Sequence, residues 1–335
     1  MSDSAPVLIE VWRGGMVESR HRGAYAIVDS EGDVIAAQGD IERPVYARSA
    51  IKPLQALPLI ETGAADSWGV SPEELAIACA SHGGESRHVE IVSRWLERMG
   101  LGPADLECGA HPPSHAPSAR TLSASGREPS ALHNNCSGKH TGMLATCRLL
   151  KEPTEGYIHL HHPEQRRVIG VLSEMCGIDL SDAPRGIDGC GLPQLGIPLK
   201  ALAFAFARFG SPAGLRTTRE AACRRIAAAM RAHPFLVAGS GRFCTRAIKI
   251  AGDKALVKTG AEGMYVAALP AQGLGIALKI DDGAARAAEA AMATLLIRHA
   301  RLDAAQIDAF QPWCMPPVLN VAGAAVGKIA PAADF

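Results

Sequence analysis

The stretch ALVKTGAEGMYVAALPAQGLGIALKI, residues 255–280, decides the fold. Three apolar segments, 255–260, 264–270 and 274–280, are separated by glycine-containing breaks, a pattern typical of short strands joined by tight turns. The other end of the chain resembles it. VLIEVWRGG (7–15) is rich in β-forming residues, and AYAIVDSEGDVIAAQGD (24–40) predicts two strands around a turn at Glu31-Gly32.

The middle of the chain has a different periodicity. Apolar residues at helical spacing predict helices over 71–81, 86–100, 162–177, 217–233 and 283–300. VLNVAGAAVGKIA (318–330) adds one or two final strands, and 107–140 is predicted to be a long loop. We therefore expect an α+β fold of one domain over 1–335. Its antiparallel sheet would use about 1–45 and 245–335, and its helical part about 46–244.

Composition excludes several classes of function. The chain has 335 residues, with 34 Lys+Arg against 34 Asp+Glu, so no net charge attracts nucleic acid or an anionic membrane. A small-molecule substrate is expected instead. The first residues lack the pattern of a signal peptide, and no apolar run approaches a membrane span. Nine scattered cysteines do not suggest a disulfide framework and predict a cytoplasmic protein.

The stretch YARSAIKPLQALPL (46–59) places Ser49 three residues before Lys52. Residues at i and i+3 of a helix lie on one face, so the lysine amine could activate the serine hydroxyl. Pro53 supports a helix start at this point. The alternative is an ordinary helix start, because this spacing also arises by chance.

Two further motifs strengthen the catalytic interpretation. Lys258-Thr259-Gly260 lies on a predicted strand and matches the K-T-G that accompanies S-x-x-K in serine acyl-transferring enzymes. Ser81, in ASHGGE, follows a predicted helix and could replace the S-x-N element of those enzymes. Gly83 stands where that element has asparagine, which argues against a lactam-processing enzyme.

NNCSGKHTGML (134–144) and GIDGCGLP (186–193) could together form a binding site. Gly138 predicts a turn whose amides point at a ligand. Cys136, Lys139 and Cys190 could converge on a metal, because two thiolates suit zinc. Lysine is a rare ligand, and cysteines of this kind are more often small buried apolar residues. His140 is predicted to contact the substrate.

The motifs ARSAIKPLQ, ASHGGE, CGAHPP, NNCSGKHTGML, DGCGLP and KTGAEG, in this order, resemble the L-asparaginase II family (the Rhizobium etli type, or class 3). The resemblance spans almost the whole chain. It implies a fold similar to serine β-lactamases and glutaminases, hydrolysis of L-asparagine to L-aspartate and ammonia, and a homodimer. It also implies two Ser–Lys tandems, Ser49 with Lys52 and Ser81 with Lys258, although Lys254 lies on the same stretch as Lys258.

The resemblance further implies a zinc ion bound by Cys136, Lys139 and Cys190, supporting substrate binding rather than the chemical step. It places Arg48, Asp188 and His140 near the substrate. Three alternatives stay open: a glutaminase or another β-lactamase-like serine amidohydrolase, a sensor domain that is acylated without turnover, and a metal-storage or redox protein that uses the cysteines. The first is hard to exclude, because one methylene gives only modest discrimination.

Overall fold

The computed structural model describes residues 5–335, and its contacts divide the chain into two compact units. Among the described residues, the sheet unit consists of 5–50, 197–211 and 247–335. The helical unit consists of residues 51–196 and 212–246. The chain therefore leaves the first unit just after Ser49 and returns to it twice.

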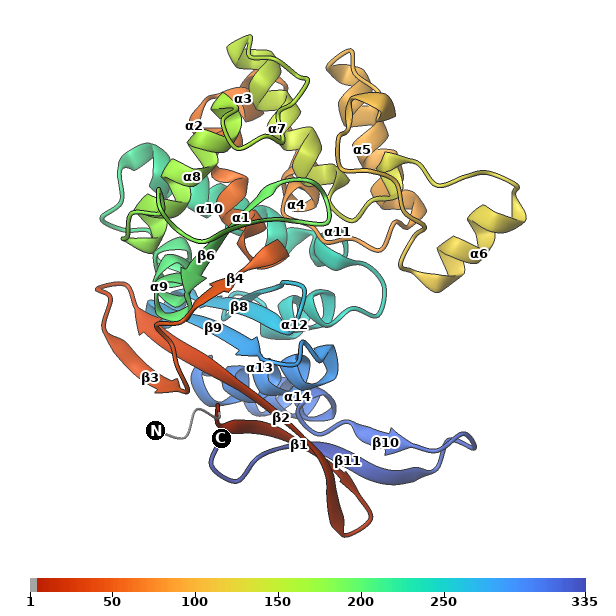
Figure 1. Cartoon of the computed structure of the whole chain (residues 1–335), viewed down its shortest axis with the longest axis vertical. Helices are drawn as coiled ribbons and strands as arrows, with labels where there is room; N and C mark the ends of the chain where they lie inside the picture. The colour runs from red at the N-terminus through yellow and green to blue at the C-terminus, as the bar shows by residue number, and fades with distance from the viewer. Residues whose placement is uncertain (1–4) are drawn as a thin grey trace. The chain divides into compact units, whose positions relative to one another are not determined.

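The strands of the sheet unit come from both ends of the chain (Figure 1). Among residues 5–335 they form one eight-stranded sheet, in the order β10-β11-β1-β2-β9-β8-β7, with β3 paired to β2. The strands are β1 (Val7–Arg13), β2 (Met16–Asp29), β3 (Val34–Gln38), β7 (Leu256–Thr259), β8 (Met264–Leu269), β9 (Leu274–Ile280), β10 (Pro317–Leu319) and β11 (Ala325–Pro331).

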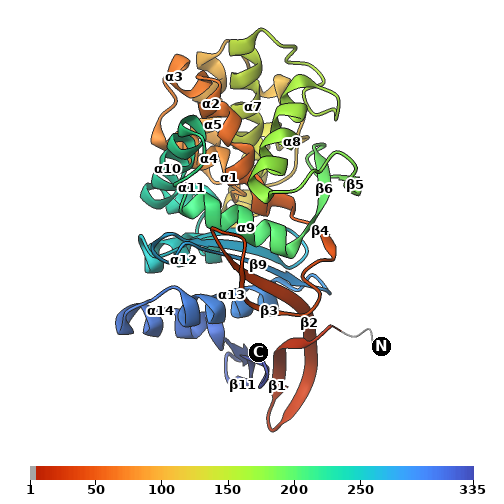
Figure 2. The same cartoon turned by 90° about the vertical axis from the view of Figure 1, so that its left-hand side faces the viewer.

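All neighbours in this sheet are antiparallel, with Val11 opposite Ile329 and Lys258 opposite Val266. Helix α9 (Leu199–Gly210) covers one face, and α13 (Ala285–His299) with α14 (Ala304–Cys314) lies on the other (Figure 2). Because helices cover both faces, β7 and β8 are buried at every position rather than at alternate ones. The predicted α+β class, with a sheet built from N- and C-terminal strands, is confirmed.

The helical unit packs around α4 (Pro72–Ala78), which contacts α5, α7, α10 and α11. Its α-helices are α1 (Lys52–Gln55), α2 (Leu57–Glu61), α3 (Ala64–Ser67), α4, α5 (Ser86–Arg98), α6 (Ala116–Ala124), α7 (Ser137–Leu150), α8 (Pro163–Cys176), α10 (Thr217–Ala232) and α11 (Pro234–Ala238). Ser71 and Glu74 form a capping box that fixes where α4 begins, as the Ser-Pro-Glu-Glu sequence predicts.

Three short strands and one further helix belong to neither list. The hairpin β5 (Arg185–Ile187) and β6 (Pro193–Pro198) is antiparallel, and β4 (Pro44–Tyr46) precedes the Ser49 region. Helix α12 (Phe243–Ala251) follows α11. The predicted loop over 107–140 is wrong in part, because it contains α6 and the beginning of α7. A proline in the first turn starts α6, where the missing N–H has no partner to lose.

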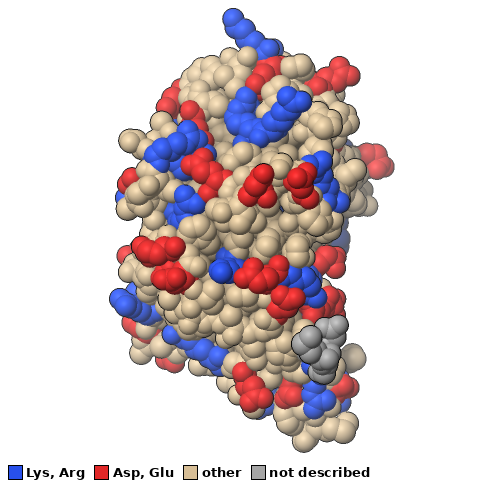
Figure 3. All heavy atoms as spheres, turned by 60° about the vertical axis from the view of Figure 1, so that its left-hand side comes forward, with Lys and Arg blue, Asp and Glu red and all other residues tan. Residues whose placement is uncertain are grey.

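The surface does not concentrate charge of one sign on the face drawn in Figure 3, where Lys and Arg lie interspersed with Asp and Glu. This agrees with the equal numbers of acidic and basic residues. Among the helices of residues 5–335, none is long and apolar enough to cross a membrane. All nine cysteines are free and buried, so the described chain contains no disulfide.

Candidate active site

Lys52 is completely buried at the start of α1. The 3₁₀ turn Arg48–Ile51 runs directly into this helix, and Pro53 occupies its first turn, as predicted. The Lys52 ammonium donates to Ala80 O at 2.5 Å, Ser81 Oγ at 3.1 Å and Asn135 O at 3.3 Å. Burial lowers the pKa of Lys52, and the positive charge of Lys139 acts in the same direction.

Ser81 lies in the segment that follows α4, and only 5% of its surface is exposed. Its backbone N–H donates at 3.0 Å to the carbonyl oxygen of Val237, a residue of α11, so this helix holds it from one side. Lys52 holds it from the other side through Oγ. A buried serine hydroxyl in contact with a buried lysine amine is an arrangement that can transfer protons.

The imidazole of His82, next to Ser81, stacks on that of His88, and His88 stacks in turn on Phe235. His82 Nδ1 accepts from Gly84 N–H at 3.2 Å, so the ring proton is on Nε2, which lies 2.9 Å from Ser137 Oγ. Burial lowers the pKa of His82 well below its usual value, and the neighbouring imidazole of His88 acts in the same direction. His82 is therefore a neutral structural group and not a second base.

Cys136, Lys139 and Cys190 are buried close together, as predicted. Cys136 caps α7, and Lys139 lies in the first turn of that helix. Cys190 lies in the turn between β5 and β6, where Asp188 N–H donates to Leu192 O at 2.8 Å. The Lys139 ammonium donates to Cys190 Sγ at 3.3 Å, and Cys190 Sγ lies 3.7 Å from Asp188 Oδ2.

These side chains interact strongly with one another. A hydrogen bond between the two thiols lowers the pKa of Cys136 well below its usual value and raises that of Cys190. Burial disfavours the Lys139 ammonium, but Cys190, Cys136 and Asp188 outweigh burial and raise its pKa. Two sulfurs and one amine in contact form a donor set that fits a soft, tetrahedral ion such as zinc.

His140 follows Lys139 on α7 and is completely buried. Its Nδ1 lies 2.7 Å from the Tyr157 hydroxyl, whereas its Nε2 is buried and has no hydrogen-bond partner within residues 5–335. Burial, with the charges of Lys139 and Lys52, holds the pKa of His140 well below its usual value. An unpaired buried N–H is rare in folded proteins and commonly marks a functional group.

Arg48, Ser49 and Lys258 belong to the sheet unit. Arg48 has a positive φ of 52° and lines a cavity of about 520 Å³ together with Tyr46 and Lys279. Lys258 is buried on β7, and its ammonium donates to Thr259 O at 2.8 Å. Lys254, by contrast, is 30% exposed and pairs with Asp303 at 3.3 Å.

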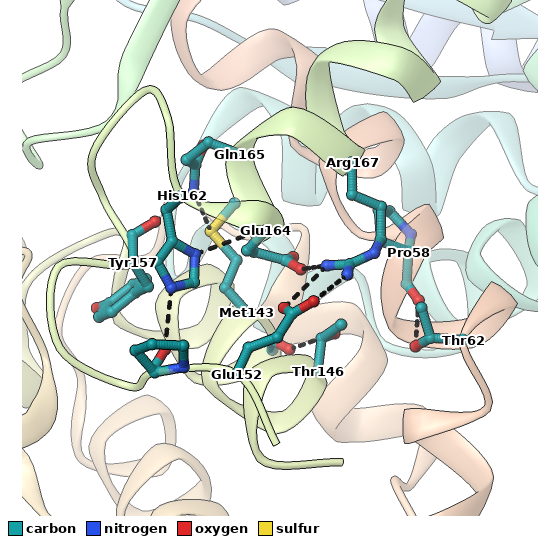
Figure 4. Close-up of polar contacts among 12 residues, drawn as sticks. Pro58, Thr62, Met143, Thr146, Glu152, Tyr157, His162, Glu164, Gln165 and Arg167 are labelled. Atoms are coloured by element: carbon teal, nitrogen blue, oxygen red, sulfur yellow. Dashed lines mark hydrogen bonds and ion pairs between the residues drawn. The ribbon is translucent and has the colours of Figure 1, made fainter. Parts of the chain in front are cut away.

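A second group that could hold a metal lies at the other end of α7. Cys147 Sγ and carboxylate oxygens of Glu152 and Glu164 are all within 4.8 Å of one another. Figure 4 shows the Arg167 guanidinium between the two carboxylates, 2.6 Å from Glu152 and 2.5 Å from Glu164. Burial raises the pKa of Cys147 to about 12 and that of Glu164 to about 7. The guanidinium of Arg167 therefore already pairs with the carboxylates that a metal ion would need as ligands.

The structure adds a reason for one glycine and adds one residue to the site. Gly138 lies in the first turn of α7 rather than in a turn ahead of the helix, and a Cβ there would be 2.3 Å from Ile77 O. Its absence of a side chain lets α7 approach α4. Asn134 positions Cys136, because its Oδ1 accepts from Cys136 N–H at 2.8 Å and its amide donates to Cys108 O at 2.7 Å. An asparagine whose side chain accepts from the N–H two residues later is typical of such a turn, and its position just ahead of a helix start is the signal in the sequence.

A comparison with known protein families shows which family this chain belongs to. The sequence profile described as L-asparaginase II matches residues 9–331. A chain that this profile matches over almost its whole length belongs to the family that the profile describes. It is a member of the L-asparaginase II family. The resemblance inferred from the motifs is thereby confirmed.

The solved structures that match this chain have low sequence identity to it. The native form of Mglu has 15% sequence identity and a TM-score of 0.47, with 84% of this chain and 65% of that chain covered. A β-lactamase from Mycobacterium bovis has 14% identity and a TM-score of 0.43, with 82% and 94% covered. This chain thus spans just under two thirds of the length of Mglu. A comparison with curated protein sequences finds no match.

Proposed function

We propose that this protein hydrolyses L-asparagine to L-aspartate and ammonia through a serine nucleophile. One observation carries the proposal: in a chain of the L-asparaginase II family, a buried lysine amine touches a buried serine hydroxyl, Lys52 to Ser81 at 3.1 Å. The same lysine also donates to Asn135 O, the residue before Cys136. The Ser–Lys group and the candidate metal group are therefore linked through one short segment.

In the proposed mechanism Ser49 attacks the side-chain amide carbon of asparagine, and Lys52 accepts the hydroxyl proton. The C–N bond breaks as that proton is delivered to the leaving nitrogen, which gives ammonia and an acyl-enzyme. Ser81 and Lys258 relay protons, and water then attacks the acyl-enzyme to release aspartate. Backbone N–H groups, including that of Ser49, stabilise the oxyanion. The burial of Lys258, against the exposed ion pair of Lys254, supports Lys258 as the second lysine.

We propose that the substrate is bound by Arg48, Asp188 and His140. The guanidinium of an arginine has two parallel N–H donors that fit a carboxylate such as that of the substrate. Cys136, Lys139 and Cys190 would hold zinc, with Lys139 bound as the neutral amine. When bound, zinc would supply a positive charge that helps to orient the substrate. Asn134 holds Cys136, and Asp188 lies beside Cys190, so both groups support the donor set. We further propose a cytoplasmic homodimer.

The experiment that tests this function measures ammonia release from L-asparagine and L-glutamine side by side, with wild type and Ser49→Ala. Release from asparagine that disappears in Ser49→Ala supports both the activity and the nucleophile. Equal release from glutamine would favour the glutaminase alternative. Activity retained in Ser49→Ala would instead assign the nucleophile to Ser81. One stoichiometric acylation without turnover would indicate a sensor.

A further inference from the structure

Tyr157 lies between α7 and α8, and its side chain is completely buried. Its carbonyl oxygen accepts from Gln165 Nε2 at 2.9 Å, and its hydroxyl accepts from Glu107 N–H at 3.0 Å. Figure 4 shows the ring beside His162 and Gln165. Neither contact involves His140, so the position of the hydroxyl is fixed independently of that residue.

Among residues 5–335, the acceptor for the hydroxyl hydrogen of Tyr157 is His140 Nδ1, at 2.7 Å. Since Glu107 N–H already occupies a lone pair on the hydroxyl, donation to Nδ1 satisfies both groups. The opposite tautomer, with the proton on Nδ1, would leave the hydroxyl hydrogen without an acceptor. It would also leave Nε2 without a donor. Hydrogen-bond satisfaction therefore selects the Nε2–H tautomer of His140.

This tautomer leaves one buried donor, His140 Nε2–H, without a partner among residues 5–335. Burying an unsatisfied N–H disfavours the ligand-free state, and an acceptor that pairs with it removes this cost. We propose that Tyr157 is a positioning residue that fixes the tautomer of His140, so that Nε2–H donates to an oxygen of a small amino acid bound in the site. The identity of that ligand rests on the proposed function, but the tautomer does not.

Nitrogen NMR of ¹⁵N-histidine-labelled protein tests the tautomer directly. The His140 signals are identified as those that disappear in His140→Gln. We expect a protonated Nε2 and an unprotonated Nδ1 in the wild type, and a mixture of tautomers in Tyr157→Phe. A wild-type His140 protonated at Nδ1 would overturn the proposal, whether or not any variant folds.

Kinetics test the consequence for the substrate. Tyr157→Phe should lower kcat/KM for asparagine about tenfold or more, chiefly through KM, because the bond to Nε2–H is present in the bound ground state. Thr146→Val is the matched control: it removes a buried hydroxyl from the same helix as His140, where it donates to Gly142 O at 3.2 Å. We expect this control to change kcat/KM by less than about twofold.

A double-mutant cycle separates positioning from packing. Glutamine places an amide N–H near the position of Nε2 and has no tautomers. In a His140→Gln background, Tyr157→Phe should therefore have much less effect than in the wild type. The same tenfold loss in both backgrounds would make Tyr157 a packing residue and refute the proposal.

The two proposals fail separately. A folded wild type that releases no ammonia from asparagine would refute the proposed function. The same protein can then be titrated with L-aspartate while the His140 signals are followed. A shift of the Nε2–H signal in the wild type that is reduced in Tyr157→Phe supports the role of Tyr157, and the absence of any shift refutes it.

Discussion

The ammonium nitrogen of Lys52 lies 3.1 Å from the hydroxyl oxygen of Ser81, and both groups are buried. In sequence Lys52 stands three residues after Ser49, which suggests one Ser–Lys pair. In the structure the serine hydroxyl in contact with this amine is that of Ser81. Proton transfer through Lys52 would therefore affect both serines, and a substitution at Lys52 is the most informative single change in the site.

Lys52→Arg should lower kcat for ammonia release by roughly 10²–10⁴. Arginine keeps the positive charge but does not give up its proton, so it cannot act as a base. Lys254→Arg is the control, because Lys254 forms an exposed ion pair with Asp303. The control should stay close to wild type. A Lys52→Arg enzyme that keeps more than about a tenth of wild-type kcat would exclude Lys52 as the base.

The stability of the protein should fall on acidification below about pH 6.5. Burial lowers the pKa of His82 and His88 in the folded state, whereas both titrate normally in the unfolded chain. The unfolded chain therefore binds more protons as the pH falls through its own pKa. The stabilisation is fully present above about 6.5 and is lost as the pH falls toward the folded-state values. Urea unfolding between about pH 8 and pH 5 measures this loss.

His88→Gln should flatten this pH dependence, because one buried histidine no longer has to be protonated on unfolding. The exposed His161→Gln is the matched substitution and should leave the slope unchanged. An unfolding free energy that is constant between about pH 8 and pH 5 in the wild type would contradict the assignment of His82 and His88 as neutral groups.

The sheet could be predicted from sequence because its strands carry local signals. Alternating or continuous apolar runs end at glycines, as at 255–280 and at the Glu31-Gly32 turn, and the structure reproduces them as β7, β8, β9 and the β2–β3 hairpin. Helix α6 was missed because a Pro- and Ser-rich segment has weak helix propensity. There the proline starts a helix rather than preventing one.

The site is harder to predict, because its contacts join segments far apart in sequence. The motifs predict Lys52, Ser81, Cys136, Lys139 and Cys190 as individual residues, and Lys139 indeed meets Cys190 across 51 positions. They do not predict Tyr157, which lies in an irregular segment and carries no motif. The sequence does not show why Gly138 is a glycine, because a glycine near a helix start can serve a bound ligand, a close helix contact or both. The position of Ile77 O shows the close contact.

Zinc, if bound as proposed, should depend on Cys136 and Cys190 and not on Cys147. Wild type and Cys147→Ser should each retain about one zinc per chain, whereas Cys136→Ser and Cys190→Ser should retain far less. Cys147 is the matched control because it is a buried cysteine on the same helix, next to carboxylates that already pair with Arg167. Elemental analysis by mass spectrometry after dialysis measures the content. Zinc that is lost in Cys147→Ser but kept in Cys190→Ser would move the metal to Glu152 and Glu164.

Gly239→Ala should destabilise the protein by about 3 kcal/mol and also reduce kcat. Gly239 has φ 112° and ψ −174°, a region that only glycine adopts readily, and a Cβ there would lie 2.5 Å from Glu85 Oε1. Glu85 accepts from Ser240 N–H at 2.8 Å and from Ser240 Oγ at 2.7 Å, so the clash would displace this loop.

The loop directly follows α11, and the carbonyl oxygen of Val237 in that helix accepts from Ser81 N–H in the candidate site. Activity should therefore fall even where Gly239→Ala remains folded. Gly241→Ala is the control, because Gly241 also has a positive φ of 71° but nothing lies within 4 Å of its added Cβ. Gly241→Ala should lower the free energy of unfolding by about 1 kcal/mol and leave kcat unchanged. Urea unfolding measures the unfolding free energy of both variants. Equal losses in the two would show that the contact with Glu85 relaxes without cost. An unchanged kcat in Gly239→Ala would show that the loop does not position Ser81.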